Sequence, residues 1–307
     1  MAALVQALKP LCPALGVFTR MSPESEFLLQ PRLLKVQGMK TLFLLGLLAL
    51  PSTALPLMAR AEVQSQADIL SAQMLPGWQM ANGHYMAGLD LALAPHWKTY
   101  WRAPGETGIP PSFDWSGSQN VAAVQVHWPT PQVIILNGLQ SIGYLDAVLL
   151  PLEVTAKDPG QPVALHLQMQ LGICKDICMP AALTLDASLG GAEDPRITKA
   201  LNAGPITPQA AGLQAITCQI APIDDGLHVV AQLTLPRQGS PETVVLESGD
   251  QTVWVAQAAS SRNGPLLTAA ADFVPVKGQP FDLQRNQVTV TVIGQTHSVE
   301  ITGCPAP

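Results

Sequence analysis

The sequence predicts an all-β protein in which two β-sandwich domains follow a signal peptide. Proline and glycine are plentiful, with 28 and 24 residues, and short Val, Leu and Thr runs lie between turn-forming stretches, as is typical of all-β chains. The length of 307 residues is enough for two ordinary domains. Charged residues are only 12% of the chain and the net charge is −6, so the composition does not indicate nucleic-acid binding.

The amino-terminal part has the anatomy of a secretory signal peptide, which we place at residues 39–61. Lys40 supplies a positive charge, residues 41–50 form a short apolar stretch, and Ala59-Arg60-Ala61 is a cleavage signal before Glu62. We therefore expect the mature chain to begin near Glu62.

The alternative is an uncleaved membrane anchor. Pro51 and Pro56 interrupt the apolar stretch, which falls short of the ~20 apolar residues that a spanning helix needs. Cleavage is therefore favoured, and we expect no fold in residues 1–38. The predicted location is the periplasm, an oxidising compartment in which cysteines tend to be paired or redox-active.

Residues 62–190 are predicted to form the first β domain. Its clearest strand is 163–172, where apolar side chains alternate with Ala, His and Gln, as in a half-buried strand. The apolar positions are Val163, Leu165, Leu167, Met169 and Leu171. The other expected strands are 83–94, 97–101, 121–128, 146–155 and 178–188.

A linker with a short helix is predicted at residues 191–211. Asp194 is a candidate N-cap, Pro195 suits the first helical position, and Gly204-Pro205 stops the helix. The second β-sandwich domain is placed at residues 212–307.

Two hairpins are expected in this second domain. One turns through Asp224-Asp225-Gly226, and the other closes the domain with a turn near Gly294-Gln295. Cys218 and Cys304 fall on its first and last expected strands, which favours a buried structural disulfide over two free thiols.

The candidate functional residues are Cys174 and Cys178, in the stretch LGICKDICMP. Along one straight strand their Cα atoms would be ~13 Å apart, whereas a disulfide needs them within about 7 Å. A hairpin loop at residues 175–177 would place the two cysteines opposite each other. A single helical turn would also bring them close, but the strand patterns on both sides favour the hairpin.

Three chemistries fit this pair. A structural disulfide would gain little from so short a loop, and strained or exposed disulfides are the labile ones, which favours redox activity. Copper(I) is the third, because Met179, and with less support Met169, could add soft ligands to the thiols. Met169 falls on the apolar face of its strand, where core packing is the better explanation.

The sequence around the pair resembles the N-terminal periplasmic domain of the DsbD thiol:disulfide interchange family. GICKDICMP is similar to the redox loop of that family, and HWKTYWRAPGETGIPPSFDW, VQVHWPTP and IGYLDAVLLPLEV are similar to its preceding blocks in the same order. The resemblance covers residues 68–190, and the carboxy-terminal part more weakly resembles the extra domain of copper-sensitivity suppressor proteins.

This resemblance implies an immunoglobulin-like sandwich in which the cysteine pair shuttles between dithiol and disulfide. It implies that Cys178 forms mixed disulfides, that Cys174 resolves them, and that a loop at about 136–144 caps the pair. The cap residues carried over are Leu136, Asn137, Gly138, Leu139 and Tyr144.

The resemblance also implies partners. Electrons would come from a separately encoded membrane thiol:disulfide donor, and the clients would be periplasmic thioredoxin-like or disulfide-isomerase proteins. We expect no cofactor, no metal site and no nucleic acid. The alternatives are a periplasmic copper-handling protein that uses Cys174 and Cys178, and a secreted β-sandwich binding module with structural disulfides.

One further cluster, Trp97, Tyr100 and Trp101 in HWKTYW, is predicted to belong to the core and sheet edge rather than to a docking patch.

Overall fold

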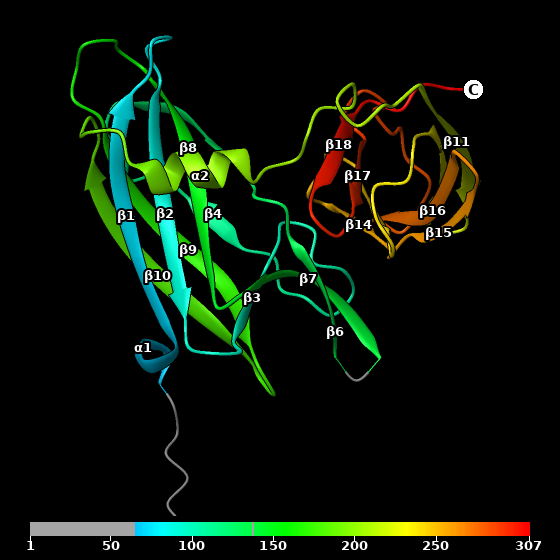
Figure 1. Cartoon of the computed structure of the whole chain (residues 1–307), viewed down its shortest axis with the longest axis horizontal. Coiled ribbons are helices and arrows are strands. Elements are labelled where there is room, and N and C mark those ends of the chain that lie inside the picture. Colours follow the sequence, from blue (N-terminus) through cyan, green and yellow to red (C-terminus); the bar gives the residue numbers. More distant parts are fainter. Residues whose placement is uncertain (1–64, 137) are drawn as a thin grey trace, which may run out of the picture. The chain divides into compact units, whose positions relative to one another are not determined.

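The structure is a computed structural model that describes residues 65–136 and 138–307. The expected signal peptide, residues 1–38, the cleavage position before Glu62, and Asn137 lie outside the described residues. The described chain is almost entirely β, as the sequence predicted, and it builds immunoglobulin-like β-sandwiches from four sheets (Figure 1).

The first sandwich begins with the short helix α1 (Gln66–Ile69) and packs a four-stranded sheet against a larger one. The four-stranded sheet has the order β1-β2-β8-β5, with β1 (Leu70–Gln79), β2 (Tyr85–Leu93), β8 (Ala147–Ala156) and β5 (Val121–Val126). The larger sheet has the order β10-β9-β3-β7-β6, and β4 also pairs with β9. Its strands are β10 (Cys178–Ser188), β9 (Ala164–Cys174), β3 (Lys98–Tyr100), β7 (Leu139–Leu145), β6 (Gln132–Leu136) and β4 (Ser112–Asp114).

The core of this sandwich follows from side-chain alternation. On β9 the residues that the sequence pattern assigned to the apolar face are all buried, while Gln168 and Gln170 are exposed. The buried side chains of β9 meet leucines of the opposite sheet in one hydrophobic cluster, which includes Leu89, Leu91, Leu150 and Leu152. The inner faces of the two sheets are therefore closed by apolar contact, and polar chemistry is left to their outer faces and loops.

The helix α2 (Pro195–Asn202) lies across the outer face of the four-stranded sheet (Figure 1). Asp194 is its N-cap, and the carboxylate accepts a hydrogen bond from the backbone N–H of Arg196 at 2.9 Å. Ile197 is fully buried against Leu75 and Met86. The helix therefore covers part of a sheet face that would otherwise be exposed to water.

The second sandwich pairs a five-stranded sheet with a three-stranded one. The first has the order β11-β12-β16-β14, with β15 also on β16, and contains β11 (Ala215–Ile223), β12 (Gly226–Thr234), β16 (Leu266–Pro275), β14 (Val253–Val255) and β15 (Ala259–Asn263). The second has the order β13-β17-β18, with β13 (Thr243–Glu247), β17 (Thr289–Ile293) and β18 (Ser298–Thr302).

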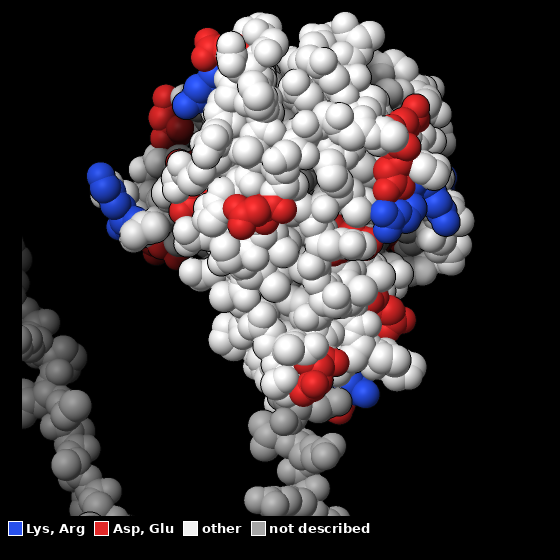
Figure 2. Space-filling model, turned by 90° about the vertical axis from the view of Figure 1, so that its left-hand side faces the viewer, with Lys and Arg blue, Asp and Glu red and all other residues white. Residues whose placement is uncertain are grey.

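Charged side chains are sparse on the face shown in Figure 2, where a few acidic and basic groups are separated by uncharged surface. This pattern agrees with a composition of 12% charged residues. None of the helices within 65–136 and 138–307 combines the length and hydropathy needed to span a bilayer.

Candidate redox site

Cys174 and Cys178 form a disulfide that closes the hairpin between β9 and β10. Cys174 is the last residue of β9, Cys178 is the first of β10, and the two are register partners with Cα atoms 4.1 Å apart. The loop is the three-residue turn that the spacing predicted, and its Lys175 N–H donates to the carbonyl of Ile177 at 3.1 Å. The hairpin is therefore confirmed over the alternative of a helical turn.

The two cysteines of this disulfide differ strongly in exposure. Cys174 is fully buried, whereas Cys178 is exposed, together with the three loop residues. A thiolate that approaches from solvent therefore reaches the sulfur of Cys178 first. Attack there makes Cys174 the leaving group.

The short strand β3 runs beside Cys174 and divides its side chains between two environments. Trp97 and Trp101 face inward and are buried in the core of the first sandwich. Lys98 is the register partner of Cys174, so Lys98 and Tyr100 lie on the outer face with the disulfide. The predicted core placement is confirmed by the burial of all three aromatic side chains, and Tyr100 in addition contacts the disulfide.

Tyr100 is in direct contact with the disulfide. Its hydroxyl donates to Sγ of Cys174 at 2.9 Å and lies 3.4 Å from Sγ of Cys178. Burial raises the pKa of Tyr100 above its ordinary value of 10.0, so the hydroxyl keeps its proton at neutral pH and acts as a donor. A donor here is matched to the negative charge that forms on sulfur when the disulfide opens.

Glycines on the neighbouring strands make room for this tyrosine. A Cβ on Gly172 of β9 would lie 3.0 Å from Cδ2 of Tyr100 and 2.9 Å from Cβ of Ile109. Gly143 of β7 is the register partner of Tyr100, and a Cβ there would overlap the carbonyl of Thr99. Gly172 of β9 and Gly108, in the loop that follows β3, therefore border the ring, whereas Gly143 lets β7 pair closely with the backbone of β3.

Lys98 is a buried amine next to this ring. Lys98 is only 8% exposed, and its Nζ donates to Oγ of Ser141 at 2.8 Å. The same Nζ lies 5.6 Å from the centroid of the Tyr100 ring, within the range of a cation–π contact. Loss of hydration lowers the pKa of Lys98 below its ordinary value of 10.5. The sequence reasoning missed Lys98, Tyr100 and Ser141, although the alternation in WKTYW could have separated Lys98 and Tyr100 from the tryptophans.

The segment expected to cap the pair forms a β-hairpin rather than an irregular loop. Leu136 ends β6 and Leu139 begins β7, and the two are register partners at the tip with exposures of 45% and 60%. Tyr144, which the family resemblance placed in the cap, is instead a core residue that is 5% exposed and whose hydroxyl donates to the carbonyl of Pro129 at 2.7 Å. Of the expected cap residues, Leu136 and Leu139 thus remain as exposed apolar side chains, whereas Tyr144 does not.

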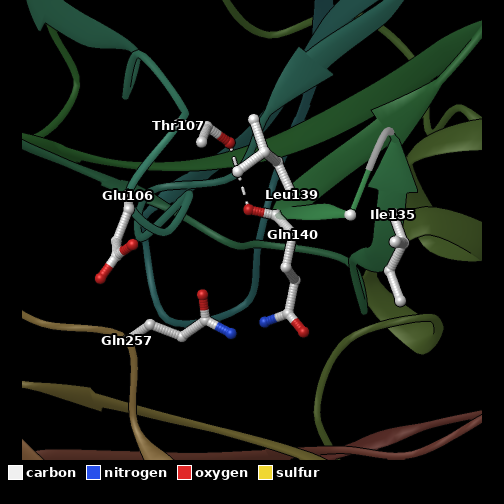
Figure 3. A pocket seen from close by; sticks show the side chains of 7 residues that line it. Glu106, Thr107, Ile135, Leu139, Gln140 and Gln257 are labelled. Atoms are coloured by element: carbon white, nitrogen blue, oxygen red, sulfur yellow. Dashed lines mark hydrogen bonds between the residues drawn. The ribbon is translucent and has the colours of Figure 1, made fainter.

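A pocket of about 260 Å³ lies beside this tip (Figure 3). The hydroxyl of Thr107 donates to the carbonyl of Gln140 at 3.1 Å, which ties the loop after β3 to β7. The lining residues are Glu106, Thr107, Ile135, Gly138, Leu139, Gln140 and Gln257.

The second disulfide joins Cys218 of β11 to Cys304, just after β18, with Cα atoms 5.4 Å apart. Both cysteines are buried, at 0% and 1% exposure. Arg285 donates to the carbonyl of Cys218 at 2.8 Å. The protein therefore shields both sulfurs of this second disulfide from solvent.

Groups that could bind a metal are not gathered in the described part of the chain. No three His, Cys, Asp or Glu side chains within 65–136 and 138–307 are arranged to hold an ion. Met169 is buried in the core, and Met179 is half-buried and packs against it.

An exposed and a buried cysteine are joined in one hairpin of the first sandwich, and exposed disulfides are the ones most open to thiol exchange. Residues 66–188 match the family described as thiol:disulfide interchange protein DsbD, N-terminal, and this segment is a member of that domain family. The crystal structure of the N-terminal periplasmic domain of ScsB from Proteus mirabilis is similar, with a TM-score of 0.57, 20% identity, and coverage of 77% of this chain and 92% of that chain. At this identity the likeness supports the fold. A search of curated proteins gave no match.

Proposed function

We propose that this chain is a periplasmic thiol:disulfide interchange protein that passes electrons between a membrane donor and periplasmic client proteins through Cys174 and Cys178. The observation that carries the proposal is the difference in exposure between the two cysteines, because it assigns each one a separate step. The family match over residues 66–188 and the expected signal peptide at 39–61 support the chemistry and the location.

In the first half of the cycle a thiolate of the donor attacks Sγ of Cys178. A bond forms between the donor sulfur and Cys178, the bond between the two cysteines breaks, and its electron pair stays on Cys174 as a thiolate. Tyr100 donates its hydrogen bond to this leaving sulfur, which it already contacts at 2.9 Å. A second thiolate of the donor then attacks the donor sulfur that is bonded to Cys178. The donor forms its own disulfide, Cys178 leaves as a thiolate, and the 174–178 pair is reduced.

In the second half the thiolate of Cys178 attacks a client disulfide and forms a mixed disulfide with it. Cys174 then attacks Sγ of Cys178, which re-forms the hairpin disulfide and releases the client as a dithiol. The register pairing of the two cysteines keeps them in position for this intramolecular step.

Trapping tests the proposal. The Cys174→Ala variant of the full chain, expressed in its native periplasm, should accumulate mixed disulfides at Cys178, because nothing remains to resolve them. The matched Cys178→Ala variant should trap little, because Cys174 is buried. Mass spectrometry of the adducts identifies donor and client. Equal trapping by both variants, or none by either, would contradict the assignment.

A further inference from the structure

The outer face of the larger sheet carries a cation that the exchange steps above do not use. Lys98 is buried and donates to Ser141, and within residues 65–136 and 138–307 it takes part in no ion pair. A buried ammonium without an anion opposes folding, because the charged form has lost its hydration. Structural stability therefore does not explain a lysine at this position.

The surroundings of Lys98 show what its charge can act on. Cys174 on β9 is its register partner, Tyr100 follows two residues later on the same face, and Ser141 on β7 is uncharged. Cys178 begins β10 on the far side of the sulfur pair. The loop residues Lys175 and Asp176 are exposed, so water screens their charges. The group that gains a negative charge close to Lys98 is thus Cys174, when the disulfide opens.

We propose that Lys98 is a positioning residue for thiol:disulfide exchange, whose ammonium group, held over Tyr100, favours the thiolate that Cys174 becomes on reduction. This inference rests on the proposed function for its biological purpose, but it concerns a property of the cysteine pair itself. In the oxidised state the Lys98 cation has no anionic partner among the described residues, and reduction supplies one in the thiolate of Cys174.

The charge acts through Tyr100 as well as through space. A cation 5.6 Å from the ring centroid draws electron density from the phenol and makes its O–H a stronger donor. That O–H is directed at Sγ of Cys174 at 2.9 Å. Ser141 fixes the position of the ammonium, since its hydroxyl accepts from Nζ at 2.8 Å. Ser141, Lys98, Tyr100 and Cys174 thus form a continuous contact chain that ends on the buried sulfur.

The test is the reduction potential of the 174–178 pair in the full chain, measured against glutathione, with Lys98→Met and Lys98→Arg as the matched variants. Lys98→Met removes the charge and keeps the unbranched stem. We expect it to shift the equilibrium with glutathione about tenfold toward the disulfide, which corresponds to about 30 mV. Lys98→Arg keeps the charge and should shift it clearly less. Lys98→Gln, which is neutral but can still donate to Ser141, repeats the measurement if the methionine variant folds poorly.

A second readout excludes a purely structural effect. In a Cys178→Ala background, the thiolate absorbance of Cys174 should titrate at higher pH in Lys98→Met than with native Lys98. The oxidised Lys98→Met protein should unfold at the same or a higher temperature than the native protein, because a buried charge has been removed. An unchanged potential and an unchanged Cys174 titration in a folded Lys98→Met variant would overturn the inference. Because neither measurement needs a partner, a shifted potential with no trapped client would reject the proposed function alone.

Discussion

The hydroxyl of Tyr100 lies 2.9 Å from Sγ of Cys174, the buried member of the hairpin disulfide. A disulfide sulfur is a weak acceptor, whereas a thiolate accepts a charge-assisted hydrogen bond of about twice the strength. The same contact is therefore stronger in the reduced state than in the oxidised state. It favours the step in which Cys174 leaves, and it makes the buried cysteine a better leaving group than its burial alone would allow.

The first prediction is that Tyr100→Phe slows reduction of the 174–178 disulfide. The phenyl ring fills the same space beside Gly172, but the leaving sulfur loses its donor. Since hydrogen bonds to charged groups contribute about 1.5–3 kcal/mol, we expect a decrease of about tenfold or more in the rate with dithiothreitol. The rate is measured under pseudo-first-order conditions at neutral pH.

Tyr144→Phe is the control for this experiment, because its hydroxyl donates to Pro129 and not to sulfur. That variant can lose stability but should reduce at the native rate. An equal decrease in both variants would show that the effect of Tyr100→Phe is structural.

The second prediction is that Lys98→Met and Tyr100→Phe are not additive. If the ammonium group acts partly through the phenol, the shift in reduction potential caused by Lys98→Met should be smaller when Tyr100 is already Phe. The double-mutant cycle needs four potentials and one circular dichroism spectrum for each protein. Full additivity would mean that the charge acts on Cys174 only through space.

The third prediction concerns the pH dependence of the Lys98 effect. Below the pKa of Cys174 the reduced state is a neutral thiol, so the charge has nothing to favour. Desolvation lowers the pKa of Lys98 below its ordinary value of 10.5. At a pH above this lowered pKa the side chain is a neutral amine, and the effect on the potential disappears again. The difference in potential between native protein and Lys98→Met should therefore be largest between these two pKa values. A difference that stays constant from acid to alkaline pH would contradict this account.

Much of the fold can be predicted from the sequence because local signals agree with tertiary packing. The alternation on β9 and the Asp194-Pro195 start of α2 are examples, since each is specified within a few residues. β1 was missed because Pro76 and Gly77 interrupt its pattern. The structure accommodates them in a bulge between Leu75 and Trp78, which is possible because β1 is an edge strand and Gly77 adopts a φ of 62°.

The site divides in the same way. The cysteine pair could be found because its spacing limits the geometry to a turn. Alternation in WKTYW separates Lys98 and Tyr100 from the tryptophans, but it could not show that they meet the disulfide. β3 has only three residues, and their neighbours Ser141 and Gly172 come from distant parts of the chain. The cap was expected to be a loop because that expectation was carried over from the family resemblance, whereas the residues on either side of its tip pair as β6 and β7.

The fourth prediction is that the two disulfides differ in how readily they are reduced. Cys178 is exposed, whereas Cys218 and Cys304 are both buried. Mild dithiothreitol followed by alkylation and peptide mapping should therefore label Cys174 and Cys178 before the other pair. Equal labelling of all four cysteines would remove the reason to regard the hairpin pair as the reactive one.

The fifth prediction tests the hairpin tip as a cap. Leu136 and Leu139 are register partners and so share one face of the β6–β7 hairpin, and both are large apolar side chains that remain partly exposed. If they shield Cys178, the double variant Leu136→Ala with Leu139→Ala should speed reduction by dithiothreitol several-fold. The reduction potential should stay unchanged, because a cap limits access to the sulfurs without altering the energies of the two redox states.

Ile135→Ala is the matched control, since Ile135 is 70% exposed and projects from the opposite face of the same hairpin. Faster reduction in the leucine variant alone would support the cap, whereas the native rate in that variant, or the same increase in the Ile135→Ala control, would assign the shielding of Cys178 to another part of the chain.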